Sequence, residues 1–167
     1  MIERNPLIDK LKNKKVLFIG CKFYYFQDEI ISKMEAFGAD VTYYPTRDTS
    51  IRYGIVNRLF HHKLERYQEW YYHKLWGEIK DLSFDYFLLI RGMLMPRTFV
   101  EKLKAKNPGM ISIMYQWDSN VNAPFLKLKP SLDTISLFDR IFSFDYKDVE
   151  DNPNLRYAPT FSMDDII

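Results

Sequence analysis

The stretch that decides the fold is Ile111-Ser112-Ile113-Met114-Tyr115-Gln116-Trp117-Asp118-Ser119. Its first five residues are almost all apolar, which is typical of a strand buried on both faces of a parallel sheet. It then ends abruptly in polar residues and a tryptophan, although packing does not require an aspartate beside a tryptophan at the end of a strand. Because ligands bind outside the carboxyl ends of strands in open α/β sheets, we expect a functional site at Gln116, Trp117, Asp118 and Ser119.

Similar apolar runs recur on both sides of this stretch and alternate with segments of helical spacing. The other predicted strands are Val16–Gly20, Val41–Tyr44, Tyr86–Ile90, Arg140–Phe144 and Leu155–Ala158. The predicted helices are Gln27–Phe37, the long segment 52–80, Pro96–Lys104 and the short Leu132–Phe138. Alternating strands and helices imply parallel pairing with right-handed crossovers. We therefore predict an α/β fold with a doubly wound, mostly parallel, Rossmann-like sheet of five or six strands and helices on both faces.

The length and composition predict one globular domain. The chain has 167 residues, of which 47% are hydrophobic and 28% charged, enough to build a core. We expect a basic N-terminal lead over residues 1–13, a single Rossmann-like domain over 14–161 and an acidic tail over 162–167 that frays.

Charge and cysteine content narrow the function classes. A net charge of +2 argues against a nucleic-acid binder, which usually has a clear basic excess. The single cysteine, Cys21, excludes an internal disulfide and any multi-cysteine metal site, and fits a reducing compartment. The sequence has neither a signal peptide nor an apolar stretch long enough to span a membrane. We therefore expect a cytoplasmic protein.

The first predicted turn, Gly20-Cys21-Lys22-Phe23-Tyr24-Tyr25-Phe26, argues against a dinucleotide cofactor. The dinucleotide-binding turn needs a glycine-rich pattern so that the backbone can approach a pyrophosphate, and this turn has one glycine followed by bulky aromatic residues. No P-loop pattern occurs either. Two interpretations stay open: the loop packs against the core, or Lys22 contacts a polar acceptor.

Two arginines follow predicted strands. Arg91 comes directly after the strand Tyr86–Ile90, and Arg47 follows Val41–Tyr44. A guanidinium group can bind a carboxylate or phosphate with two parallel hydrogen bonds, so either arginine could bind substrate. The alternative is that each caps a helix or pairs with an aspartate.

Asp118 is the strongest acid–base candidate. Its carboxylate could take a proton from an acceptor hydroxyl, while Trp117 shields it or stacks on the apolar face of a sugar. The alternative is that Asp118 caps the next segment, since Asp118-Ser119-Asn120 is good turn chemistry. Asp145 is a second, weaker candidate for this edge of the sheet.

The long predicted helix over 52–80 has two polar features. His61, Glu65, Glu69 and His73 are spaced four residues apart, which would suit a metal, but one helix face cannot close a metal site and a solvated face explains the same pattern. We therefore predict no metal. The helix also combines basic residues with tryptophans and tyrosines, which is typical of a surface that docks on an anionic membrane or a partner. The alternative is that its apolar stripe faces the core of its own domain.

Three segments together resemble a known family. They are Lys15-Val16-Leu17-Phe18-Ile19-Gly20, Tyr115-Gln116-Trp117-Asp118-Ser119, and Phe138-Asp139-Arg140-Ile141-Phe142-Ser143-Phe144-Asp145, the last followed by a short strand that ends in Ala158-Pro159. Over roughly residues 14 to 161 the chain resembles the N-terminal domain of bacterial GT-B-fold glycosyltransferases, in particular the CgeB-like and capsular or lipopolysaccharide biosynthesis group.

The resemblance implies two Rossmann-like domains with a cleft between them, the N-terminal one holding the acceptor and the C-terminal one most of the nucleotide-sugar. It implies that this chain is the acceptor-side domain of a transferase for cell-surface polysaccharide, with a sugar or a lipid-linked acceptor. The chain holds one such domain, so we expect no cofactor of its own, and a nucleotide-sugar donor only with a second domain or partner chain. The alternative is a non-catalytic interaction domain that docks a partner, or the inner face of a membrane, through the helix over 52–80.

Overall fold

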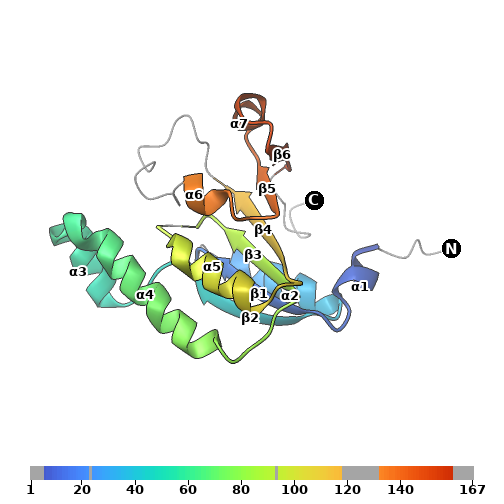
Figure 1. The fold of residues 1–167 in the computed structure, drawn as a ribbon, viewed down its shortest axis with the longest axis horizontal. Coiled ribbons are helices and arrows are strands. Elements are labelled where there is room, and N and C mark those ends of the chain that lie inside the picture. The colour runs from blue at the N-terminus through green and yellow to red at the C-terminus, as the bar shows by residue number, and fades with distance from the viewer. Residues whose placement is uncertain (1–5, 23, 93, 118–131, 160–167) are drawn as a thin grey trace.

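The computed structural model describes residues 6–22, 24–92, 94–117 and 132–159. Its six strands form one all-parallel sheet in the order β2-β1-β3-β4-β5-β6 (Figure 1). The strands are β1 (Lys15–Gly20), β2 (Asp40–Pro45), β3 (Tyr86–Ile90), β4 (Ile111–Gln116), β5 (Arg140–Ser143) and β6 (Leu155–Tyr157). The predicted fold class is therefore confirmed.

Helices cover both faces of the sheet. They are α1 (Pro6–Leu11), α2 (Phe26–Ala36), α3 (Ile51–Leu59), the 3-10 turn η1 (His61–Lys63), α4 (Leu64–Ile79), α5 (Arg97–Lys106), α6 (Leu132–Ile135) and α7 (Tyr146–Asp151). On one face, α4 and α5 pack against the fully buried Leu17, Phe87 and Met114 of the central strands (Figure 1). On the other face, α2 packs against Phe18 and its neighbours. Because helices bury both faces of the sheet, the central strands are almost continuously apolar.

The prediction of one continuous helix over 52–80 is wrong. The chain leaves the helical conformation at Phe60, with φ −131° and ψ 44°. Tyr53 and Tyr67 are fourteen residues apart and would be separated by about 21 Å along a straight helix. Their ring centroids instead lie 6.2 Å apart, so α3 folds back against α4. Hydrophobic periodicity does not reveal such a reversal because each half keeps its own apolar face.

Two strand and helix boundaries differ from the prediction in ways that affect the site. Gln116 is the last residue of β4 and does not lie in the following loop. A helix that was not predicted, α7, follows β5, and Asp145 caps it by accepting a hydrogen bond from the Lys147 N–H at 2.9 Å. The cap is ordinary helix-start chemistry, but α7 is too short to produce a periodic apolar pattern.

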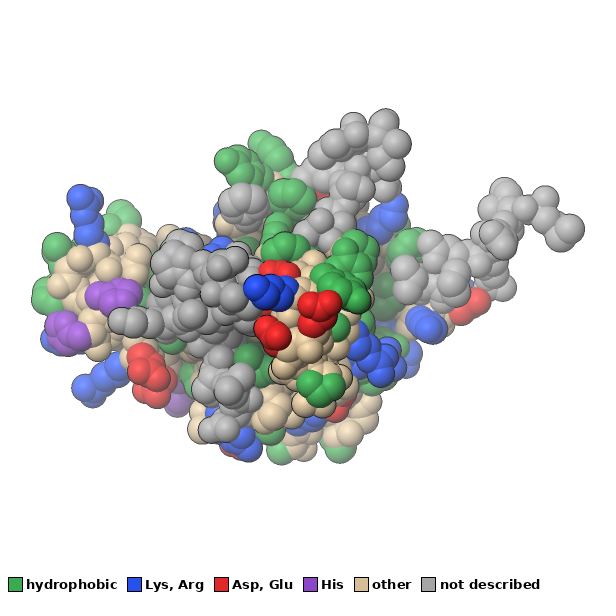
Figure 2. Space-filling model, turned by 90° about the horizontal axis from the view of Figure 1, so that it is seen from above, with side chains coloured by type: hydrophobic (Ala, Val, Ile, Leu, Met, Phe, Trp, Pro, Cys, Tyr) green, Lys and Arg blue, Asp and Glu red, His purple; other side chains and the backbone are tan. Residues whose placement is uncertain are grey.

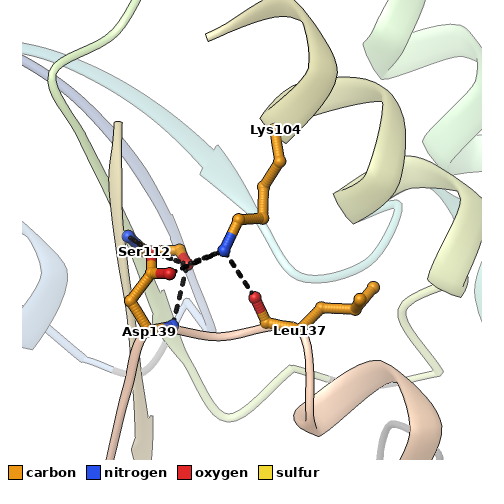
Figure 3. A network of polar contacts seen from close by, with 4 residues as sticks. All are labelled: Lys104, Ser112, Leu137 and Asp139. Atoms are coloured by element: carbon orange, nitrogen blue, oxygen red, sulfur yellow. Dashed lines mark hydrogen bonds and ion pairs between the residues drawn. The ribbon is translucent and has the colours of Figure 1, made fainter. Parts of the chain in front are cut away.

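At the amino ends of the strands, which we call the amino edge of the sheet, two aspartates form hydrogen bonds that link separate segments. Each aspartate lies just before a strand. Asp85 accepts hydrogen bonds from the Lys15 N–H and the Lys14 ammonium, both at 2.9 Å. Asp139 accepts from the Ser112 N–H at 2.8 Å and from the Lys104 ammonium at 2.7 Å, as Figure 3 shows. These contacts join segments far apart in the sequence.

The Lys104–Asp139 cluster is completed by shared donors and acceptors (Figure 3). The Ser112 hydroxyl donates to Asp139 at 2.7 Å, and the Lys104 ammonium also donates to the Leu137 carbonyl oxygen at 2.8 Å. Burial alone would raise the pKa of Asp139, but the hydrogen bonds from Lys104 and Ser112 and the nearby ammonium charge lower it overall. The carboxylate is therefore held in its charged form.

The strand order defines a switch point at the carboxyl edge. From β1 the chain crosses to β2 on one side, and it then returns across β1 to β3 and continues away through β4, β5 and β6. The loops that follow β1 and β3 therefore lead in opposite directions. In parallel sheets a ligand crevice forms at such a point.

Candidate functional site at the carboxyl edge of the sheet

The two loops at the switch point contain unusual backbone conformations. Tyr24 follows β1 with φ 50°, and Arg91 and Leu94 follow β3 with φ 52° and 43°. The other described residues with positive φ, Asn13 and Gly38, lie at the amino edge. Positive φ is uncommon for residues other than glycine, and strained backbone tends to cluster at functional sites. This concentration marks the switch point as the candidate site.

Packing beneath the β3 loop fixes its position. The Arg91 N–H donates to the Tyr115 carbonyl oxygen at 3.1 Å, which ties the loop to the end of β4. Gly92 is buried, and a Cβ atom there would lie 2.6 Å from the side chain of Leu89, itself fully buried. Only glycine lets the backbone press this closely onto the core, so the half-buried Arg91 is held at the edge by the residue that follows it.

Aromatic side chains line the same edge. Tyr24 and Tyr25 are 75% and 72% exposed, so the loop after β1 does not pack all its aromatic residues into the core. The next residue, Phe26, meets Trp117 in an edge-to-face contact with ring centroids 5.4 Å apart. We call Tyr24, Tyr25, Phe26 and Trp117 the aromatic wall. It brings together the loops after β1 and β4, which lie on either side of β3.

The charges around this wall are unevenly distributed. Lys22 is exposed in the loop after β1, and Arg91 lies half-buried after β3. The first turn of α2 carries Asp28 and Glu29, whereas that of α5 carries no acidic residue. The positive end of the α5 dipole is therefore not neutralised by its own side chains. An anionic group at this edge would be more favourable near Arg91 and α5 than near the start of α2.

The loop after β2 is engaged in holding α3. The Arg47 guanidinium lies over the Tyr53 ring at 4.8 Å from its centroid, so it stacks on α3. Asp48 accepts hydrogen bonds from Ser50 and, at 2.5 Å, from the Tyr67 hydroxyl. Burial would raise the pKa of Asp48, but these hydrogen bonds lower it overall. Arg47 is therefore exposed at the carboxyl ends of the strands, as predicted, and its guanidinium also helps to hold α3 through Tyr53.

Tyr43, in β2, forms a hydrogen bond with the last residue of β1. Its hydroxyl donates to the Gly20 carbonyl oxygen at 3.1 Å. Burial, helped by the nearby Cys21 and Asp28, raises the pKa of Tyr43 to about 12. The hydroxyl therefore stays protonated at neutral pH and can keep donating to Gly20, the last residue of β1, two positions before Lys22.

The remaining predicted site residues have different surroundings. Gln116 is 3% exposed and points to the same face as Met114, with its amide 3.9 Å from the Met114 sulfur. Asp145 uses one carboxylate oxygen to cap α7. Asp118 and Ser119 lie outside the described residues, so their predicted roles stay predictions. Among the described residues, Lys22, Arg91 and Trp117 follow the three neighbouring strands β1, β3 and β4 around the switch point.

A separate hollow of about 240 Å³ lies between α4 and α5, lined by Glu69, His73, Trp76, Phe99 and Lys102 among others. Glu69 and His73 belong to the series of histidines and glutamates, spaced four residues apart, that the sequence analysis considered as metal ligands. No three His, Cys, Asp or Glu side chains of the described segments lie close enough to hold a metal ion.

The described segments also contain no helix that is both long and apolar enough to cross a bilayer.

Comparison with known proteins adds no relative. No family model, curated protein or solved structure matches this chain. The resemblance to GT-B-fold glycosyltransferases therefore rests on the sequence segments alone, and the function must be argued from the site itself.

Proposed function

We propose that this chain is the acceptor-binding domain of a glycosyltransferase for cell-surface polysaccharide, and that it binds a saccharide at the aromatic wall. The observation that carries this proposal is the Phe26–Trp117 contact at 5.4 Å, which joins the loops after β1 and β4 beside the switch point. Open α/β sheets bind ligands at this position.

The exposed aromatic rings suit a saccharide. One face of a pyranose ring carries C–H groups that pack on an aromatic surface, while its hydroxyls need polar partners at the rim. Tyr24 and Tyr25 offer both, since each has a large ring and a hydroxyl and each is mostly exposed. A site built for an apolar ligand would bury these rings more completely.

The basic residues suit an acceptor that carries an anionic group. Lys22 and Arg91 lie after adjacent strands, and the start of α5 adds a positive dipole end. A phosphate or carboxylate of the acceptor would bind at these cations rather than at the acidic first turn of α2. The donor, a nucleotide-sugar, would be held by a second domain across the cleft, as the family resemblance implies.

Saccharide binding is the direct test. The purified chain should bind members of an array of oligosaccharides and sugar phosphates, and Trp117→Ala should weaken that binding at least tenfold. Trp70→Ala is the matched control, because Trp70 is an exposed tryptophan of α4, 49% accessible, outside the aromatic wall. A chain that binds no saccharide, or a Trp70→Ala variant that loses as much affinity as Trp117→Ala, would contradict the proposal.

The predicted general base, Asp118, requires a different measurement. With the donor-binding domain and nucleotide-sugar present, Asp118→Asn should lower turnover by roughly 100-fold or more, because a neutral amide cannot accept the proton of the acceptor hydroxyl. Saccharide binding should persist in the same variant. Unchanged turnover would remove Asp118 from the mechanism and leave acceptor binding intact.

A further inference from the structure

Helix α3 exposes its apolar stripe to solvent. Ile51, Ile55 and Leu59 recur every four residues and are 84%, 47% and 66% exposed, and Phe60, just past the helix, is 43% exposed. The buried residue of the helix, Tyr53, lies on the opposite side and contacts α4 through Tyr67. The helix therefore presents its aliphatic side chains away from its own core, the reverse of an ordinary surface helix.

The charged residues of α3 and η1 are all positive. From Ile51 to Lys63 the sequence contains the basic residues Arg52, Arg58 and Lys63 and no acidic residue. At about 100° per residue, Arg52 and Arg58 lie on opposite flanks of the stripe formed by Ile51, Ile55 and Leu59. This short segment therefore carries a local charge of +3 in a chain whose total is +2.

The stripe lies at an accessible end of the molecule. Figure 1 shows α3 beyond the edge of the sheet, at the end away from α1. In Figure 2 the same end shows basic, histidine and hydrophobic side chains, with acidic side chains next to them. The two neighbouring histidines, His61 and His62, are exposed in η1.

We propose that α3 and η1 dock this chain on an anionic lipid membrane. An apolar stripe flanked by basic residues is the pattern of helices that lie in the membrane interface, with the stripe among the acyl chains and the cations at the headgroups. A second copy of the chain is a poor partner, because a two-fold contact would place Arg52 and Arg58 against the same residues of the other copy. The inference is independent of the proposed saccharide site.

The helix has nine residues and is about 14 Å long, so binding by one copy is expected to be weak and reversible. Cosedimentation with vesicles measures it. The chain should bind vesicles that mix phosphatidylcholine with phosphatidylglycerol, should bind phosphatidylcholine alone far less, and should be released by added salt.

Two sets of variants locate the contact. Ile51→Ser/Ile55→Ser/Leu59→Ser and Arg52→Glu/Arg58→Glu should each weaken vesicle binding by more than about tenfold. Leu82→Ser is the matched apolar control, because Leu82 is 43% exposed elsewhere on the surface. Lys102→Glu/Lys106→Glu, on α5, is the matched charge control, because it also reverses two exposed cations. All these residues are exposed, so circular dichroism should report an unchanged fold.

Three outcomes would overturn the proposal. The first is no binding to anionic vesicles at low salt. The second is vesicle binding that survives in the α3 variants. The third is a dimer by light scattering, or a complex with an acidic protein, that is lost in the α3 variants while vesicles are not bound. That result would assign the stripe to a protein partner.

Discussion

The two edges of the sheet differ in how they use polar groups. At the amino edge Asp85 and Asp139 each join a strand to a lysine from another part of the chain, with carboxylate–ammonium distances of 2.9 and 2.7 Å. At the carboxyl edge Lys22 and Tyr24 are exposed, and three non-glycine residues have positive φ, against Asn13 alone among the described non-glycine residues at the amino edge. The difference teaches that Asp85 and Asp139 form their ion pairs with lysines at the end of the sheet opposite the proposed ligand site, so the two ends can be perturbed separately.

The largest expected effect is on the amino edge. Asp139→Ala should lower the free energy of unfolding by about 3 kcal/mol, because it removes hydrogen bonds to Ser112 and Lys104 and leaves the buried Ser112 N–H without that acceptor. Urea denaturation measures the change. Asp151→Ala, an exposed acid of α7, is the control and should change stability by less than about 0.5 kcal/mol. Equal losses of unfolding free energy in the two variants would show that the hydrogen bonds of Asp139 do not stabilise the amino edge.

The next effect lies at the carboxyl edge. Gly92→Ala should cost about 2 kcal/mol, because its Cβ would come within 2.6 Å of the buried Leu89 side chain. Gly109→Ala is the matched control, since a Cβ there meets no atom within 4 Å. The same urea measurement distinguishes them. If both variants are equally stable, the loop after β3 is not held by packing under Gly92.

A smaller effect is the pH dependence of stability that the two aspartates of the amino edge confer. The pKa of Asp85 is lowered by hydrogen bonds from the Lys15 N–H and the Lys14 ammonium, and that of Asp139 is lowered overall by Lys104 and Ser112. A lowered pKa in the folded state adds stability that is complete above the ordinary aspartate pKa of about 3.9 and is lost as the pH falls through the lowered value. The urea midpoint should therefore fall less between pH 5 and 3 in Asp85→Asn/Asp139→Asn than in the original chain. An identical fall in both proteins would argue against this linkage.

The smallest stability effect is expected at the proposed saccharide site. Tyr24→Ser/Tyr25→Ser should change the free energy of unfolding by less than about 0.5 kcal/mol, because both rings are mostly exposed. Saccharide binding should nevertheless fall about tenfold. A large stability loss would mean that the aromatic wall is part of the fold, and unchanged binding would move the site elsewhere.

The sequence predicts the strands well, because each central strand must be apolar to be buried on both faces. Side-chain alternation also places Gln116, a predicted ligand contact, on the same face as Met114, where the structure buries it. The exposure of Tyr24 and Tyr25 could not be predicted, since the sequence of an aromatic loop does not tell whether its rings pack on the core or face solvent. The reversal at Phe60 was missed because no glycine or proline marks it.

The positions of two prolines have a consequence for solubility. Among the described strands, β2 and β6 are the outer ones, and outer strands present backbone groups that can pair with another chain and start aggregation. β2 ends in Pro45, while β6 is three residues long, carries the exposed Arg156 and is followed closely by Pro159. Proline lacks the N–H that a new ladder would need. The β6 margin therefore offers only a short template for pairing with another chain, and Pro45 ends the template that β2 offers.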